Sequence, residues 1–212
     1  MTVAGNTFRK NVSLDQPTWA ANQHAMQILS TYRFTVEDYH RLVDAGVLGE
    51  DDRVELLDGD LVVMAPISGP HRGVVDWLAM FFTDARQGRY NVGVQNPVLL
   101  NDRSEPQPDV VLYRPALRNA HPKPDDIFLL VEVATSSLAY DLGAKLEAYA
   151  RAGICETWVI DVVGTELHVH RDPDQVDRGY RDTQTLRPGA VARVAAFPDV
   201  CVPVAGLFGL GR

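Results

Sequence analysis

Apolar and polar positions recur along this chain with two spacings, and the changes between them outline a series of helices and strands. Residues 35–46, TVEDYHRLVDAG, and residues 69–88, GPHRGVVDWLAMFFTDARQG, carry apolar side chains at helical spacing and end on a glycine, so both predict helices. Residues 53–64, RVELLDGDLVVM, hold two short apolar runs around Asp58-Gly59, which is a strong hairpin signal. Further strands are predicted at residues 90–94, 96–100 and 108–114.

The stretch from residue 127 onward predicts a strand–helix–strand unit. Residues 127–133, IFLLVEV, are apolar on both faces, which is typical of a central strand covered by helices. Residues 137–153 have helical spacing, and residues 157–163 and 166–172 predict two more strands. Beyond them the chain is turn-rich with short strand-like pieces. This order predicts an α/β fold with a central mixed β-sheet flanked by helices.

The composition is that of one globular domain with a terminal extension. The chain has 212 residues, 46% of them hydrophobic and 23% charged. Residues 1–30 are polar and aperiodic, so we predict an N-terminal arm there and a single domain over residues 31–212. No apolar run approaches the roughly 18 residues that span a bilayer. There is no signal-peptide pattern, and Cys155 and Cys201 form no disulfide framework, so we expect a cytoplasmic protein without a membrane partner.

The net charge weighs against tight, sequence-independent binding of nucleic acid. It is −8 at pH 7, whereas such affinity comes mainly from Lys and Arg side chains that neutralise phosphates. A local basic patch can still bind DNA on one face, so the charge lowers the expectation without excluding this class of partner.

Glu132 is the residue that is hardest to explain by structure alone. It lies in FLLVEVATSS, residues 128–137, near the C-terminal end of the predicted central strand. An unpaired ionised carboxylate in an apolar interior costs several kcal/mol or more. Functional sites of open α/β sheets collect at the carboxyl ends of their strands. We therefore expect Glu132 to face a cation in a functional site.

Three other charged residues occupy unusual places. Asp109 begins a predicted strand directly after a proline, and Glu55 lies in the hairpin on the face opposite to its apolar neighbours. Lys145 lies early in the helix that follows Glu132, where the positive helix terminus disfavours a cation. Taken singly, each also fits a solvated surface residue, and Lys145 could pair with Asp141 four positions earlier.

Taken together, these residues indicate a reaction. Carboxylates that converge in a partly dry cleft repel one another, and a divalent cation that prefers oxygen ligands, such as Mg²⁺ or Mn²⁺, relieves the repulsion. Such an ion lowers the pKa of a bound water, and a nearby lysine stabilises developing negative charge. The set favours metal-dependent phosphodiester hydrolysis. The sequence has no G-x-S-x-G elbow, phosphate-binding G-x-x-x-x-G-K-[ST] loop or C-x-x-C pair.

The order of these residues resembles the Uma-type restriction endonucleases, a family of the PD-(D/E)XK nuclease superfamily. The segments VELLDGDLV, SEPQPDVVLYR and DLGAKLEAYARAGICETWVID carry the resemblance, which runs from Arg33 to Asp172, about two thirds of the chain. It implies a restriction-endonuclease-like core over residues 31–212. It also implies a Mg²⁺-dependent endonuclease that hydrolyses DNA.

The resemblance further implies the roles of individual residues. Asp109 and Glu132 would bind Mg²⁺, for which Mn²⁺ can substitute, and the Val133 backbone carbonyl and Glu55 are candidate further ligands. Lys145 would act on the attacking water and the scissile phosphate, with Glu55 as a helper acid.

One position departs from the superfamily pattern. A lysine is expected two residues after Glu132, where this chain has Ala134; in the Uma-type pattern the lysine lies on the next helix, which matches Lys145. The missing strand lysine leaves open a catalytically silent DNA-binding or protein-interaction module of the same fold. A metal phosphoesterase acting on small nucleotides is a third alternative.

Two weaker expectations complete the reading. His71, at the start of the helix over residues 69–88, is a candidate phosphate contact, because a helix N-terminus favours phosphate; the alternative, a solvated histidine at the helix entry, fits the residues slightly better. We also expect a homodimer, since double-strand cleavage by enzymes with one active site commonly requires two-fold pairing.

Overall fold

The structure, a computed structural model of the chain, describes residues 31–49, 52–117 and 120–210. The chain divides between Thr31 and Tyr32 into two units, and every helix and strand named below belongs to the second unit, Tyr32–Arg212. The arm predicted over residues 1–30 lies outside the described residues. Among the residues described, no helix is both long enough and apolar enough to cross a membrane.

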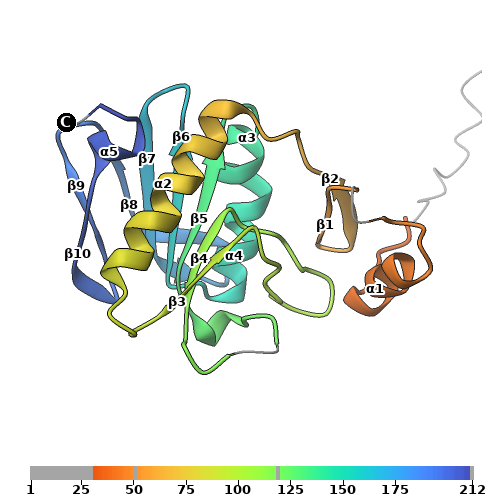
Figure 1. The fold of residues 1–212 in the computed structure, drawn as a ribbon. Helices are drawn as coiled ribbons and strands as arrows, with labels where there is room; N and C mark the ends of the chain where they lie inside the picture. The colour runs from red at the N-terminus through yellow and green to blue at the C-terminus, as the bar shows by residue number, and fades with distance from the viewer. Residues whose placement is uncertain (1–30, 50–51, 118–119, 211–212) are drawn as a thin grey trace, which may run out of the picture. The chain divides into compact units, whose positions relative to one another are not determined.

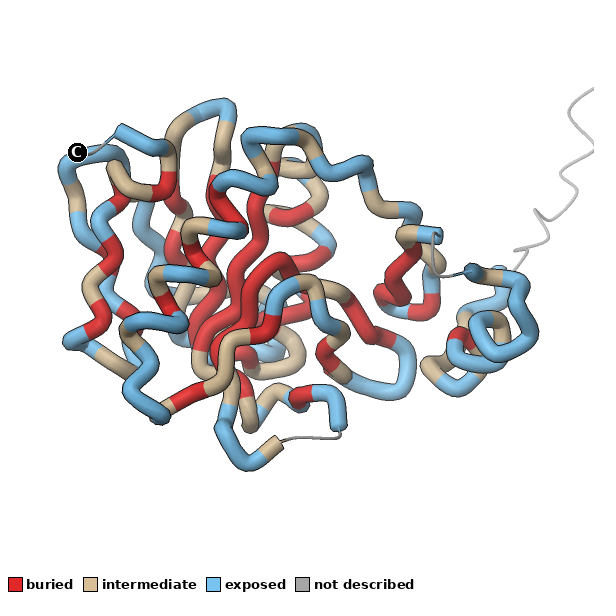
Figure 2. The backbone as a smooth tube through the Cα atoms, in the orientation of Figure 1, coloured by how far each residue is buried: buried red, intermediate tan, exposed pale blue. Residues whose placement is uncertain are grey.

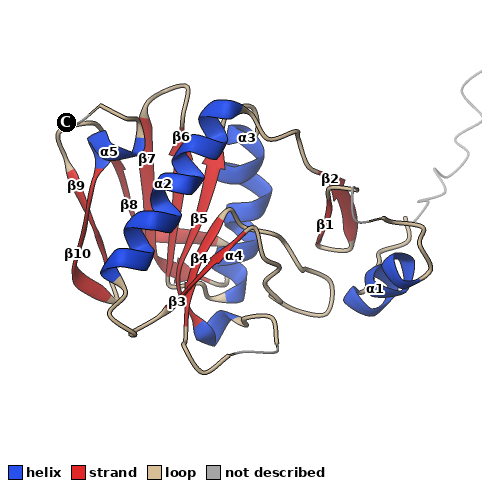
Figure 3. Cartoon of the chain, in the orientation of Figure 1, coloured by secondary structure: helices blue, strands red, loops and turns tan. Residues whose placement is uncertain are grey.

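A six-stranded sheet forms the centre of the second unit (Figures 1 and 3). Its strand order is β3-β4-β5-β6-β7-β8, and only β5 and β6 run parallel, so the sheet is mixed as predicted. The strands are β3 (Asn91–Val94), β4 (Val110–Tyr113), β5 (Ile127–Ala134), β6 (Glu156–Asp161), β7 (Glu166–Asp174) and β8 (Gly179–Leu186).

Helices cover both faces of this sheet. Successive residues of a strand point to opposite faces. On β5, Leu129 and Val131 join the apolar cluster of α2 (Gly69–Ala85), whereas Leu130 joins that of α4 (Leu146–Ala152). Between β5 and α4 lie α3 (Leu138–Tyr140) and the π-helical turn η3 (Asp141–Lys145). The central strands are buried on both sides (Figure 2), which confirms the predicted α/β fold.

The N-terminal part of this unit forms as its local signals predict. Thr35 caps α1 (Val36–Asp44), and a reciprocal capping box joins it to Asp38. The hairpin of β1 (Val54–Leu57) and β2 (Asp60–Val63) turns at Asp58 and Gly59, whose φ angles are +52° and +82°. Two adjacent residues with positive φ favour a short side chain and a glycine.

Two sequence expectations are wrong. Residues 96–100 are not a strand: the Val98 amide donates to the Pro106 carbonyl and the Leu100 amide to the Ser104 carbonyl, so this apolar run folds onto a neighbouring loop instead of a sheet. The region beyond residue 172 is also more regular than expected, because β8 adds a long strand to the main sheet. The remaining elements are η2 (Pro124–Asp126), β9 (Val191–Val194), β10 (Phe197–Pro203) and α5 (Val204–Leu207).

Candidate functional site

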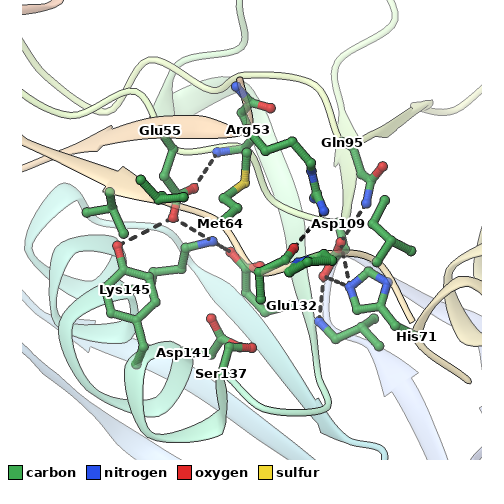
Figure 4. A pocket seen from close by; sticks show the side chains of 18 of the residues that line it. Arg53, Glu55, Met64, His71, Gln95, Asp109, Glu132, Ser137, Asp141 and Lys145 are labelled. Carbon is green, nitrogen blue, oxygen red and sulfur yellow. Dashed lines mark hydrogen bonds and ion pairs between the residues drawn. The ribbon is translucent and has the colours of Figure 1, made fainter. Parts of the chain in front are cut away.

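A cavity of about 690 Å³ opens at the C-terminal end of β5. Its walls come from the β1-β2 hairpin, the loop of residues 64–67 after it, the start of α2, the beginning of β4, and the segment after β5 (Figure 4). All the residues proposed from sequence line it, although they are up to 90 residues apart: Glu55, His71, Asp109, Glu132, Val133 and Lys145.

Lys145 joins two of the carboxylates. Its Nζ lies 3.1 Å from Glu132 Oε1 and 3.2 Å from Glu55 Oε1. All three residues are buried, with 5% or less of each residue exposed to solvent. A lysine on the segment that follows the strand therefore places its ammonium group at the strand's end. The carboxylates therefore have a neighbouring cation although Ala134 occupies the position where the superfamily pattern expects a lysine.

Burial and charge set the protonation of this pair. Desolvation raises the pKa of Glu132 well above the ordinary value of 4.5, and the Lys145 ammonium opposes that rise. Burial lowers the pKa of Lys145, but the attraction of Glu132 and Glu55 outweighs it and leaves the pKa raised. Lys145 is therefore a cation at neutral pH, and Glu132 depends on a nearby positive charge to ionise.

One carboxylate oxygen of Glu132 is hydrogen-bonded and the other is not. Tyr149, also fully buried, donates its hydroxyl to Oε1, the same oxygen that Lys145 contacts. The other oxygen, Oε2, accepts no hydrogen bond from the residues that the structure describes. Its lone pairs are available to a ligand in the cavity.

Asp109 is held by the backbone of the neighbouring strand. The Val133 amide donates to Asp109 Oδ2 at 2.8 Å, and Gln95 Nε2 donates to Oδ1 at 3.1 Å. The residue is 8% exposed, so it is not the solvated strand tip that a surface role would require. Its position follows from the pairing of β4 with β5, which sets the start of β4 beside the end of β5.

His71 contacts Asp109. Its Nε2 lies 3.1 Å from each oxygen of that carboxylate, and its Nδ1 is buried without a partner among the described residues. His71 lies in the first turn of α2, three residues after the N-cap residue Ser68. His71 is therefore neither solvated nor free at the helix start, and any phosphate contact that it makes would be shared with Asp109.

Glu55 departs from the alternation expected of its hairpin strand. All four residues of β1 are buried, because residues 104–107 cover the side of β1 that does not pair with β2. The Glu105 amide donates to the Leu56 carbonyl there. The Gln107 amide donates to Glu55 Oε2 at 3.0 Å, and the Tyr140 hydroxyl lies 3.4 Å from Oε1. Glu55 is thus an interior acid, 1% exposed.

Sequence reasoning missed two residues that line this cavity, Asp141 and Arg53, and a third, Tyr149, that is buried behind Glu132. Asp141 is 4% exposed, accepts a hydrogen bond from Ser137 Oγ at 2.6 Å, and has its pKa raised by burial. Tyr149 and Asp141 each lie four positions from Lys145, a spacing that could have identified them as members of one helix face. Arg53 lies two residues before Glu55, the spacing of one strand face.

The donor set fits a hard divalent cation by its chemistry, although it is not arranged as a metal cage. Among the described residues, no group of three or more His, Cys, Asp and Glu side chains is placed to hold a metal ion. Five carboxylates nevertheless line the cavity against two cationic side chains. Oxygen ligands and excess negative charge suit Mg²⁺ or Mn²⁺. The carboxylates are Asp52, Glu55, Asp109, Glu132 and Asp141.

Comparison with known proteins shows the family and agrees with the fold. The Uma2 family, described as "Putative restriction endonuclease", matches residues 36–205. The chain is also similar to the crystal structure of a putative nuclease belonging to DUF820 from Anabaena variabilis ATCC 29413. The TM-score is 0.67 at 14% identity, and the match covers 84% of this chain and 98% of that one. At this identity the likeness shows the fold alone. Among curated proteins, none matches the chain.

Proposed function

Since the chain belongs to the Uma2 family, which is described as "Putative restriction endonuclease", we propose that it is a Mg²⁺-dependent endonuclease of the PD-(D/E)XK type that hydrolyses phosphodiester bonds of DNA. The observation that carries the proposal is the Lys145 ammonium group, 3.1 Å from Glu132 and 3.2 Å from Glu55, in the cavity that Asp109 also lines. This arrangement supplies carboxylates for a metal and a buried cation for a phosphate in one place.

Asp109 and Glu132 would hold Mg²⁺, with Glu55 and the Val133 backbone carbonyl as further ligands. When bound, the ion would acidify a water molecule and stabilise charge on a phosphoryl oxygen. The unused Oε2 of Glu132 supports this assignment, because this oxygen accepts no hydrogen bond from the described residues and its lone pairs are free to bind a cation. The amide of Val133 and the side chain of Gln95 would keep Asp109 oriented toward the cavity.

Lys145 would orient the attacking water and stabilise the charge that develops on the scissile phosphate. Glu55 and Glu132 would hold its ammonium group in place, and their negative charge keeps it protonated. Tyr149 would hold Glu132 in place by donating its hydroxyl to Oε1, which leaves Oε2 of the same carboxylate for the metal ion. We further propose DNA as the substrate and a homodimer as the acting form, because cutting both strands with one site per chain requires pairing.

The test is cleavage of plasmid and linear DNA by the purified chain with Mg²⁺ or Mn²⁺, beside the variants Asp109→Asn and Lys145→Met. We expect cleavage by the wild type, loss of at least a hundredfold in both variants, and unchanged cleavage by Lys123→Met, whose lysine is exposed and lies outside the cavity. Equal cleavage by all four proteins would refute the assignment of the site.

Binding of Mn²⁺ separates the alternatives when no DNA is cut. Titration of the wild type and Glu132→Gln should show Mn²⁺ binding that depends on Glu132. Retained DNA binding without Mn²⁺ binding would identify a catalytically silent module. Turnover of a small phosphodiester, but not of DNA, would identify a phosphoesterase of small nucleotides.

A further inference from the structure

The carboxylates that line the cavity would repel the negatively charged phosphodiester that the proposed function assigns to it. Among the residues that the structure describes, five carboxylates and two permanent cations, Arg53 and Lys145, line its wall. Lys145 lies within 3.2 Å of two carboxylate oxygens, so most of its charge is already compensated. A phosphodiester entering this cavity therefore needs attraction from another group in addition to a bound metal ion.

Arg53 is placed to supply that attraction. It lies directly before β1, two residues before Glu55, and its partly buried side chain points into the cavity toward the end that holds Asp109 and His71 (Figure 4). It forms no ion pair with any described residue. Its one side-chain hydrogen bond within that part of the chain runs from an Nη atom to the Ala65 carbonyl at 2.7 Å.

That hydrogen bond fixes the guanidinium group without neutralising it. A carbonyl takes one N–H donor and leaves the positive charge and the remaining donors of the planar fork for a ligand. A guanidinium held in one orientation loses little freedom when it binds a planar pair of oxygens, so it suits phosphate better than a mobile lysine does. The neighbouring wall, residues 62–67, is mainly apolar, and it provides no competing carboxylate.

We propose that Arg53 is the phosphate-binding cation of this cavity and contacts a non-bridging oxygen of the DNA strand that is cut. The inference rests on the proposed nuclease function and extends it by a substrate-contacting residue. The competing explanation is structural: Arg53 would only tie the loop of residues 64–67 to β1 through Ala65. The two explanations differ in whether the residue senses the charge of the ligand.

A binding cycle measures that difference. The first probe is a thymidine tetranucleotide. The other probes are the same molecule in which a single phosphodiester linkage, a different one in each probe, is replaced by an uncharged methylphosphonate. Affinities are measured with Ca²⁺ in place of Mg²⁺ for the wild type, Arg53→Ala and Arg53→Lys. Arg114→Ala is the matched control, because Arg114 is exposed, also donates to a single backbone carbonyl, and lies outside the cavity.

If Arg53 binds phosphate, one methylphosphonate position weakens binding to the wild type by roughly tenfold to a hundredfold. Arg53→Ala should lose a similar factor with the charged ligand and no longer distinguish the two ligands at that position. Arg53→Lys should lie between, and Arg114→Ala should behave as the wild type. If Arg53→Ala keeps the full methylphosphonate penalty, the residue acts on the loop alone and the inference is wrong.

The same proteins show which proposal has failed. A wild type that cleaves DNA and binds the tetranucleotide, with an unchanged penalty in Arg53→Ala, overturns only the role of Arg53. A wild type that neither cleaves DNA nor binds the charged tetranucleotide overturns the proposed nuclease function, and the role of Arg53 with it.

Discussion

Replacing Lys145 by methionine should destabilise the fold as well as abolish cleavage. Methionine keeps most of the buried volume of lysine, so the change mainly removes the positive charge. Glu132 and Glu55 are 3% and 1% exposed, and the ammonium group is within 3.2 Å of both. Removing one partner of a buried ion pair typically costs about 3–5 kcal/mol, because the remaining charge has no compensation.

That cost is a large part of the stability of a domain of this size. A domain commonly has about 5–15 kcal/mol of unfolding free energy, and each kcal/mol corresponds to roughly 2–4 °C in melting temperature for a chain of this length. We therefore expect Lys145→Met to melt at least about 6 °C below the wild type at pH 8. The assay is thermal and urea denaturation at several pH values, followed by tryptophan fluorescence.

The pH dependence gives the prediction its sign. Burial already raises the pKa of Glu132 above 4.5, and loss of the ammonium group would raise it further. A carboxyl group whose pKa is higher in the folded than in the unfolded chain contributes stability at low pH and loses it as the pH rises through its folded-state pKa. The deficit of Lys145→Met should therefore be small near pH 4.5 and grow toward pH 8.

The control for this measurement is Lys123→Met, which removes an exposed lysine and should change the unfolding free energy by less than about 0.5 kcal/mol. A Lys145→Met variant as stable as this control at pH 8 would refute the argument, since the carboxylates would then need no buried cation. A deficit that does not change with pH would place the cost in packing and not in charge.

Three further substitutions test the fold and the site by urea denaturation. Tyr149→Phe removes a hydroxyl donor from buried Glu132 and should cost about 1–3 kcal/mol; no loss would mean that Lys145 alone satisfies that oxygen. Thr35→Ala removes the N-cap of α1 and should cost about 1 kcal/mol, and an unchanged midpoint would contradict the capping box. Gly206→Ala should cost about 1–3 kcal/mol, because its Cβ would lie 2.5 Å from Trp77 Cζ2; a neutral result would show that the indole moves aside.

The elements that the sequence predicted well are those with strong local signals. The capping box at Thr35, the Asp58-Gly59 turn and the doubly apolar run of β5 each act over a few residues, so the pattern alone identifies them. Residues 96–100 have a strand-like composition, but the Val98, Leu99 and Leu100 amides donate to the carbonyls of Pro106, Pro122 and Ser104 in the following loops, and an apolar pattern does not contain that information. The place of β8 in the main sheet is likewise decided by pairing with β7.

The site was partly predictable for a different reason. Glu132 was found because a charge in an apolar strand is costly, a local conflict that its contact with Lys145 resolves. The helix-start argument for Lys145 was wrong, because the helical segment begins at Leu138 and Lys145 lies about two turns into it; the match to the family pattern identified this residue. Arg53 creates no such conflict, since an arginine before a hairpin strand is unremarkable until the loop of residues 64–67 is placed beside it.

The π turn places Tyr140 on the cavity wall beside Asp141 and Lys145, whereas helical spacing groups only the last two of these. A regular α-helix through residues 138–152 would present one stripe of side chains to the cavity. In the structure, Tyr140 and Asp141 both line the cavity although they are adjacent in sequence, and Lys145 follows them at the end of η3. A π turn is wider than an α-helical turn, and such turns are frequent at functional sites. The widened turn lets neighbouring residues share the cavity wall, so Tyr140 reaches Glu55 while Lys145 reaches Glu132.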